Sequence, residues 1–276
     1  MNRMILFSKH WPQNSAHELC HLARYLSVDG FDLCVRAGYT VNPDNVADAL
    51  VPFVATLRTE NLHVPLVTAE GSLVQPADPT ARPILQAMDR ADIRLLKLGY
   101  FRVDPIRDYR IQFDQVRRAM EGWQQLGREY RVKICYHTHA HRRMGLNAGL
   151  LAQMINGLDP EYIGAYLDPL HLTIEGEEFE LAAAIVKPYL SVIALKDVLI
   201  HRSVVADHGR KDWAVVPAGQ GMVDWTAVFS TIRNFNYSGP LSIHGEFVVP
   251  PDQFMSELQR EVAYYRSKLN APTPGI

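Results

Sequence analysis

The chain has 276 residues, of which 47% are hydrophobic and 21% are charged, a composition typical of a soluble globular protein with a large core. Its 28 basic and 30 acidic residues nearly cancel, which excludes a basic surface for nucleic acid or an anionic membrane. The first apolar run covers only residues 4–7. It is too short for a signal or membrane-spanning segment, so we expect a cytoplasmic protein.

Eight short apolar runs rich in β-forming residues recur along the chain and predict strands. They cover residues 4–7, 31–36, 62–68, 93–99, 132–137, 163–168, 190–196 and 241–247. The segments between them show helical periodicity and helix start signals, and we expect one helix after each strand. The signals are Asn14-Ser15, Pro43, Asp108, Asp224 and Asp252.

Eight strands alternating with helices over about 250 residues predict a single-domain (β/α)8 TIM barrel. We expect the barrel to cover residues 1–270 and a flexible tail to cover 271–276. A doubly wound open sheet is the alternative, but no glycine-rich phosphate loop follows the first strand. The longest interval between strands contains residues 198–220, which we expect to be a long functional loop.

The three cysteines are far apart in the sequence and show no C-x-x-C spacing. They are Cys20, Cys34 and Cys135. A disulfide framework or a structural zinc cluster is therefore not expected, and the cysteines are interpreted as small core residues.

Polar side chains gather at the carboxyl ends of the predicted strands, the end at which TIM barrels place their active sites. They are Arg36, Lys97, His137, His139, Asp168, His171, Lys196, His244 and Glu246. Because alternate residues of a strand point to the same side, side chains from the last four strands should converge on one point. Imidazoles and carboxylates are usual ligands of zinc, manganese or cobalt. We therefore predict one divalent ion held by His137, Asp168, His244 and Glu246.

The other polar side chains at this end suggest roles around a substrate. His139, His171 and Lys196 are candidates to hold or protonate it, with Glu246 or a histidine as the base. Arg36, Lys97 and Lys196 are candidate contacts for its oxygen or phosphate groups. The expected partner is a small-molecule substrate, and a homo-oligomer is left open.

Structural roles are the alternatives for these residues. A buried histidine is often a hydrogen-bonded core residue, and Asp168 before Pro169 is typical of a residue that caps a turn. Lys196 and Asp197 are alternatively an ion pair that closes a strand. Arg36 is alternatively a partner of Asp32 or of a loop carboxylate, and His244 and Glu246 are alternatively a buried polar pair.

Five motifs in order and spacing resemble the xylose isomerase-like TIM-barrel superfamily, the sugar phosphate isomerases and epimerases. They are YHTH (136–139), DPLH (168–171), ALKD (194–197), VPAGQGMVDW (216–225) and GPLSIHGEF (239–247). FSKHW (7–11) and FDLCVRAG (31–38) are similar to a divergent branch that tends to have His-x-Glu in its eighth strand. The resemblance covers nearly the whole chain.

The resemblance implies one divalent metal held by Glu, Asp, His and Glu from strands five to eight, and proton transfer next to a ketose carbonyl. Only Asp168 matches this set. His137 and His244 stand at the two Glu positions, Ala194 stands at the His position, and Gln220 replaces a common Glu. The two carboxylates that act as acid and base in the familiar epimerases are therefore absent here.

These features predict a metal-dependent sugar isomerase or epimerase. A keto-polyol dehydratase of the inosose or dehydroshikimate type is the close alternative, because the same enediolate can expel a β-hydroxyl group. A non-catalytic sugar-binding barrel is the second alternative, supported by Ala194 and the two histidines. A nuclease of the endonuclease IV type would need a basic face and more metal ligands than this sequence offers.

Overall fold

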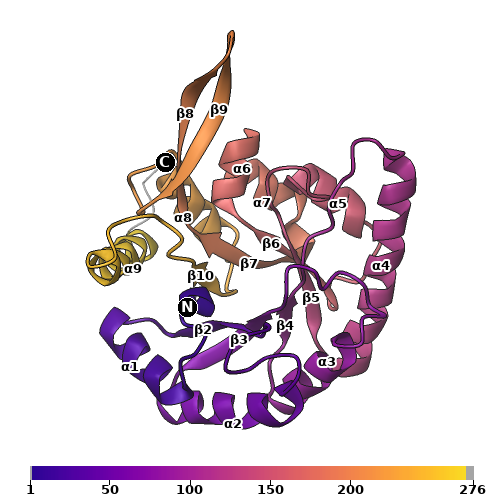
Figure 1. Ribbon diagram of the computed structural model, residues 1–276, viewed down its shortest axis with the longest axis vertical. Coiled ribbons are helices and arrows are strands. Elements are labelled where there is room, and N and C mark those ends of the chain that lie inside the picture. The colour runs from indigo at the N-terminus through magenta and orange to yellow at the C-terminus, as the bar shows by residue number, and fades with distance from the viewer. Residues whose placement is uncertain (1, 272–276) are drawn as a thin grey trace.

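The computed structural model describes residues 2–271, and within this range eight parallel strands close into a barrel. Around the barrel the strands follow the order β1-β10-β7-β6-β5-β4-β3-β2. Figure 1 shows the strands at the centre and the helices around them. The predicted (β/α)8 barrel is therefore confirmed, and the open doubly wound sheet is wrong.

The barrel strands are short, and most of their residues are buried. They are β1 (Met4–Phe7), β2 (Gly30–Cys34), β3 (His63–Thr68), β4 (Leu95–Lys97), β5 (Lys133–His137), β6 (Ile163–Leu167), β7 (Leu190–Leu195) and β10 (Leu241–Ile243). Several end before the predicted boundary, since pairing stops at the rim while the apolar sequence continues. As a result Asp168, Lys196 and His244 directly follow their strands, and Arg36 lies two residues after the end of β2.

The helices surround the barrel and connect successive strands. They are α1 (Ala16–Leu26), α2 (Val46–Thr59), α3 (Ala81–Arg90), α4 (Tyr109–Tyr130), α5 (Ala148–Ile155), α6 (Pro169–Glu175), α7 (Phe179–Ile185), α8 (Trp225–Asn234) and α9 (Phe254–Asn270), with the 3-10 turns η1 (Ser8–His10) and η2 (Lys187–Tyr189). One expectation fails, because two short helices, α6 and α7, follow β6.

Local side-chain chemistry fixes several helix starts at the predicted positions. Ser15 forms a reciprocal capping box with Glu18 at the start of α1. The side chains of Asp108 and Asp224 accept hydrogen bonds from backbone N–H groups of α4 and α8. Each cap satisfies a donor that the first turn of a helix leaves free, which stabilises the start by about 1 kcal/mol.

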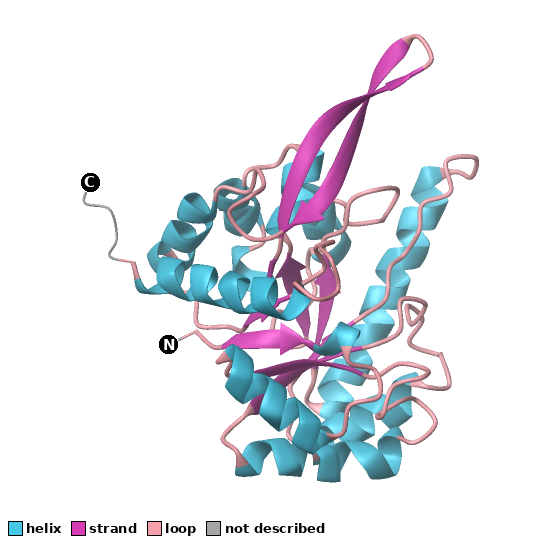
Figure 2. Cartoon of the chain, turned by 60° about the vertical axis from the view of Figure 1, so that its left-hand side comes forward, coloured by secondary structure: helices cyan, strands magenta, loops and turns pink. Residues whose placement is uncertain are grey.

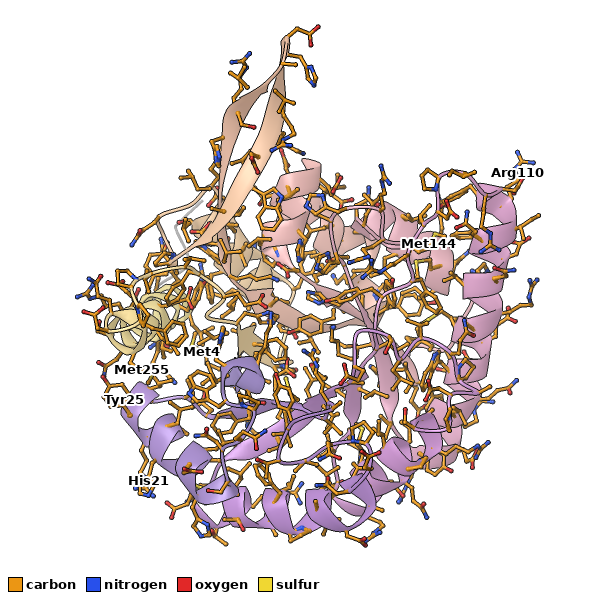
Figure 3. All side chains as sticks on the ribbon, viewed as in Figure 1. Met4, His21, Tyr25, Arg110, Met144 and Met255 are labelled. Atoms are coloured by element: carbon orange, nitrogen blue, oxygen red, sulfur yellow. The ribbon has the colours of Figure 1, made fainter. Side chains whose placement is uncertain are left out.

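Two apolar layers position the site. Inside the barrel, the lower level is filled by Ile5, Leu66, Cys135, Tyr166, Val192 and Ala194. Outside it, the other faces of the strands pack against the helices in one continuous core. Figure 3 shows side chains filling this space, while His21 on α1 and Arg110 on α4 point outward. Most polar groups of the site thus lie above the inner apolar layer, whereas Asp32 and Ser242 are level with it, paired in register with Leu66 and Ala194.

The expectation of a long loop at 198–220 is wrong over most of its length. Residues 197–216 form an antiparallel hairpin of β8 (Asp197–Val205) and β9 (His208–Val216), paired from Asp197 with Val216 to Val205 with His208. The hairpin extends beyond the ring of helices in Figures 1 and 2. At its base the Trp213 ring stacks on His141, with 5.5 Å between ring centroids.

Three smaller expectations concern the cysteines, the tail and the membrane. Cys20, Cys34 and Cys135 are free and buried, as predicted. The predicted tail lies outside the described residues except for Ala271, the residue after α9. No helix in the range 2–271 is long and apolar enough to span a membrane.

Candidate active site

A polar cavity of about 170 Å³ opens at the carboxyl ends of the barrel strands. Most of the site residues predicted from the sequence line it, namely Arg36, Lys97, His137, His139, Lys196, His244 and Glu246. Asp168 and His171 lie just behind this lining and contact it. The structure therefore brings the predicted residues together around one space.

The ammonium group of Lys196 lies at the centre of a cluster of polar groups. Its Nζ atom is 3.0 Å from Asp168 Oδ2, 3.1 Å from Glu246 Oε2 and 3.3 Å from His171 Nε2. The side chain is only 6% exposed. Burial works against its charge, but the carboxylates of Asp168 and Glu246 outweigh burial and raise the pKa of Lys196.

Both oxygens of the Asp168 carboxylate are fully engaged. Oδ1 accepts hydrogen bonds from the backbone N–H groups of Leu170 and His171, at 3.0 and 3.4 Å. Oδ2 lies 3.0 Å from His137 Nε2 as well as 3.0 Å from the Lys196 ammonium. Burial alone would raise the pKa of Asp168, but Lys196 and the neighbouring histidines hold it well below its usual value. Asp168 therefore caps α6, as one alternative predicted, and also anchors the cluster.

Three histidines on the β5 and β6 side are held as neutral rings by burial. His137 contacts the Tyr100 hydroxyl through Nδ1 at 2.8 Å and Asp168 through Nε2, and burial lowers its pKa well below the usual value. Burial likewise lowers the pKa of His171. The His139 ring stacks on His171 at 3.8 Å between centroids, and burial lowers its pKa to about 4.

The hydrogen bonds of these rings leave His139 with a free lone pair. His139 Nδ1 donates to the carbonyl oxygen of Ala140 at 2.9 Å, so in the neutral ring Nε2 carries no hydrogen. The ring lines the cavity. His171 Nδ1, by contrast, is buried with no hydrogen-bond partner among the described residues.

On the β10 side, His244 and Glu246 contact each other, as the interpretation of a polar pair predicted. His244 Nδ1 lies 3.4 Å from Glu246 Oε2, and His244 Nε2 lies 2.9 Å from the Tyr166 hydroxyl. Glu246 Oε1 also accepts a hydrogen bond from Lys9. Burial raises the pKa of Glu246, but Lys196, His244 and Lys9 together lower it far below its usual value. Glu246 is therefore a carboxylate held between two ammonium groups.

A second buried network lies deeper, around Asp32. Its carboxyl group accepts hydrogen bonds from the hydroxyls of Thr68 at 2.5 Å, Ser242 at 2.9 Å and Tyr166 at 3.3 Å. Burial raises the pKa of Asp32, although the hydrogen bonds from Thr68 and Ser242 act to lower it. Asp32 and Ser242 lie within the FDLCVRAG and GPLSIHGEF segments, and each shares the inward side of its strand with a predicted site residue. Neither segment by itself indicates a role for them in the site.

Arg36 and Lys97 lie on the β2 and β4 side of the cavity. The Lys97 ammonium is 4.0 Å from the centre of the Tyr100 ring, and no carboxylate of the described residues lies within ion-pair distance of it. Burial and then Arg36 lower the pKa of Lys97 to about 7. Arg36 donates through Nε to the carbonyl oxygen of Ala69 at 3.1 Å, not to Asp32 as one alternative predicted.

The divalent ion expected from the sequence does not fit these side chains as they lie. His137 and His244 each use both ring nitrogens in contacts with protein groups. Both oxygens of Asp168 are engaged, and the Lys196 ammonium lies between Asp168 and Glu246. Within residues 2–271, no group of three His, Cys, Asp or Glu side chains is arranged to hold a metal ion.

Asp197, next to Lys196, has a structural role instead of forming an ion pair with it. Its carboxylate accepts hydrogen bonds from the backbone N–H groups of Val198, Gly219, Gly221 and Val223 and from Trp225 Nε1. A Cβ atom at Gly221 would lie 2.2 Å from Asp197 Oδ1, so only glycine fits there. The VPAGQG segment is therefore a loop wrapped around one buried carboxylate.

The sequence from residue 20 to 260 matches the family model described as xylose isomerase-like TIM barrel. The chain belongs to this family. No protein with curated annotation matches it significantly.

Solved structures of low sequence identity share the fold. D-psicose 3-epimerase with D-tagatose from Clostridium cellulolyticum H10 has a TM-score of 0.74 and 11% identity, covering 98% of this chain and 100% of that one. The 3-keto-D-glucoside 4-epimerase from E. coli has a TM-score of 0.74 and 14% identity, covering 97% and 100%. The probable 3-DHS dehydratase of petrobactin synthesis from Bacillus anthracis has a TM-score of 0.71 and 11% identity, covering 96% and 98%.

Proposed function

We propose that this chain is an enzyme that transfers a proton at a carbon next to the carbonyl group of a sugar or keto-sugar, as isomerases and epimerases do. The observation that carries the proposal is the cavity itself. Neutral imidazoles and fixed cations face one small polar space at the active end of the barrel. The epimerases of similar fold lend support by analogy.

His139 is the best-placed base. Its ring is neutral near pH 7, its Nε2 has a free lone pair, and it lines the cavity. Glu246 is less suited, because a carboxylate that accepts from two ammonium groups has little affinity for a further proton. We therefore assign Glu246 to positioning Lys196, and His171 to supporting the His139 ring from behind.

The cations of the cavity would hold substrate oxygens. Within residues 2–271, neither Arg36 nor Lys97 forms an ion pair with a carboxylate, and both face the cavity from the β2 and β4 side. A hydroxyl, carbonyl or phosphate oxygen of a bound sugar would satisfy their free donors. No step of this proposal passes through a metal ion, since the donor atoms of the predicted ligands are already engaged.

Dehydration of a keto-polyol shares the first step, because loss of a proton beside a carbonyl gives an enediolate that can expel a β-hydroxyl group. Dehydration is therefore the alternative reaction, and the similar fold of a probable dehydratase supports it by analogy. A barrel that binds sugar without turnover is the remaining alternative.

The test is deuterium exchange in D₂O with untagged protein and a panel of ketoses, keto-sugars and keto-polyols. We expect exchange into at least one compound and no enone absorbance, whereas enone absorbance would indicate dehydration. His139→Gln should abolish exchange. His141→Gln is the matched control, because His141 lies in the same connection but contacts Trp213 outside the cavity. Sugar-induced thermal stabilisation without exchange would overturn the proposal in favour of a binding protein.

A further inference from the structure

The family resemblance implies a divalent ion, and a lysine lies among the residues expected to bind it. We propose that the Lys196 ammonium takes the place of this ion, so that the reaction proceeds without a metal. The inference rests on the proposed function for its chemistry, but its claim about the cation site can be tested without turnover.

The first argument is the position of Lys196 on its strand. Ala194 stands where the resemblance places a histidine ligand, and its methyl group belongs to the apolar layer inside the barrel. Lys196, two residues later, shares the inward side of the strand and reaches the level of the carboxylates above that layer. The chain therefore lacks the ligand and supplies a cation at the same level of the barrel.

The second argument is charge. Two carboxylates, Asp168 and Glu246, face this point, and two ammonium groups, Lys196 and Lys9, pair with them. The cluster is thus neutral without an ion. A divalent ion placed between the carboxylates would lie beside a buried ammonium group, and the like charges would repel strongly in this poorly solvated position.

The third argument is the set of contacts that Lys196 makes. An ammonium group has three hydrogens. Its contacts with Asp168 and Glu246, at 3.0 and 3.1 Å, are charge-assisted, whereas its 3.3 Å contact with the neutral His171 ring is the longest. A substrate carbonyl oxygen would therefore accept the hydrogen that the ammonium group now directs at His171. Both carboxylates would still anchor the ammonium group.

This arrangement gives a balanced proton transfer. His139 Nε2 takes the proton as the C–H bond breaks and an N–H bond forms. The electron pair of that C–H bond becomes the carbon–carbon double bond, and the carbonyl π pair moves onto the oxygen held by Lys196. Return of the proton to the face it left regenerates the substrate, and its return to the opposite face of the same carbon gives an epimer. Its return to the former carbonyl carbon gives an isomer, provided that the hydroxyl proton on the other carbon moves to the oxygen held by Lys196. A fixed ammonium stabilises the negative oxygen as a metal ion would.

The test measures metal binding and exchange in parallel on untagged protein. We expect purified wild type to carry no stoichiometric zinc, manganese or cobalt, and its melting temperature to stay constant when Mn²⁺ or Zn²⁺ is added. Exchange should survive EDTA. Lys196→Ala should lose exchange by about a hundredfold or more. Its melting temperature should now rise with Mn²⁺ or Zn²⁺, because Asp168 and Glu246 have lost the ammonium group that lies between them.

Lys9→Ala is the control for the binding measurement. It also removes an ammonium from Glu246 but leaves Lys196 in place, so its melting temperature should stay unresponsive to the ions. A wild type that contains metal, or that loses exchange in EDTA and regains it with an ion, overturns the inference. The inference is also overturned if Lys196→Ala folds but its melting temperature does not change with either ion.

The two proposals fail separately. If wild type exchanges no tested compound, the proposed function fails, while the metal content and melting measurements still decide the nature of the cation site. If Lys196→Ala does not fold, the metal content, melting response and EDTA sensitivity of wild type decide it alone.

Discussion

Lys196 and Lys97 are two buried lysines at the rim of one barrel, and they differ in their partners. Lys196 lies between two carboxylates, and its pKa is raised. Lys97 lies over the face of Tyr100, and burial and the charge of Arg36 outweigh the opposing charge of Asp32 and lower the pKa of Lys97 to about 7. The two residues are 5% and 4% exposed, so their burial is nearly the same.

The difference shows that partners, and not depth, decide what a buried lysine can do. Lys196 is a permanent cation suited to a permanent electrostatic task. The buried Lys97 ammonium group lowers the free energy of unfolding because it has lost its water without gaining a carboxylate partner among the described residues. A ligand oxygen in the cavity would offset this loss. The same substitution at the two positions should therefore have opposite effects on stability.

The largest expected effect is that of Lys196→Met. Removing this ammonium leaves Asp168 and Glu246 buried without their common partner, which should lower the free energy of unfolding by about 3–5 kcal/mol. Urea unfolding at pH 7 measures it. Lys9→Met is the control, because Lys9 is 43% exposed and its pair with Glu246 should be worth less than about 1 kcal/mol. Equal losses in the two variants would contradict the central role of Lys196.

Lys97→Met should act in the opposite direction. The methionine side chain fills similar space without a buried charge, so at pH 6 the free energy of unfolding should rise by about 2 kcal/mol. The same urea experiment measures this. A loss of stability would mean that the Lys97 ammonium has a favourable partner that its contacts do not reveal.

The gain from Lys97→Met should depend on pH. Between about 7 and 10.5, the folded wild type binds fewer protons at Lys97 than the unfolded chain, so wild-type stability rises with pH through this window. The difference in free energy of unfolding between Lys97→Met and wild type should be largest below pH 7 and should decrease toward pH 10.5. Unfolding curves at pH 6, 8 and 9.5 measure it, and a difference that is constant with pH would show that Lys97 has an ordinary pKa.

The smallest expected effect concerns His139 in acid. Its folded pKa of about 4 lies below the usual 6.5, so the folded chain binds fewer protons in this window and loses stability as pH falls through it. His139→Gln should remove about 1 kcal/mol of that loss near pH 5. Melting temperatures of the two proteins from pH 7 to 4.5 measure the slopes. His141→Gln should leave the slope unchanged, and parallel slopes for His139→Gln and wild type would refute the prediction.

The fold was predictable because a barrel strand is marked by its own residues. Runs such as 132–137 and 163–168 are short, mostly apolar and almost wholly buried, and Asp108 and Asp224 cap helices by contacts within their own turn. The hairpin was missed because its two-residue turn is Ala206-Asp207, with Ala206 at φ +52°, instead of the usual Asn-Gly or Asp-Gly.

The site was predictable only as a gathering of residues. Strand alternation and the position of TIM-barrel active sites at the carboxyl ends of the strands predict, from the sequence alone, that His137, Lys196 and Glu246 lie at one level of the barrel. Which atoms pair depends on side-chain reach across the barrel, and that information is not local. The sequence therefore suggested ligands for an ion, whereas the structure shows an ammonium between two of them. The buried hydroxyl network of Asp32 was missed for the same reason.

The base of the β8–β9 hairpin is closed by the pairing of Asp197 with Val216. The two ends of this twenty-residue ribbon therefore re-enter the barrel as neighbours, wherever its tip lies. Lengthening or trimming the tip in steps that preserve the strand register should leave the geometry of the rim intact. Trimming must stop short of Asp197, because that carboxylate fastens the chain immediately behind the lysine of the cavity.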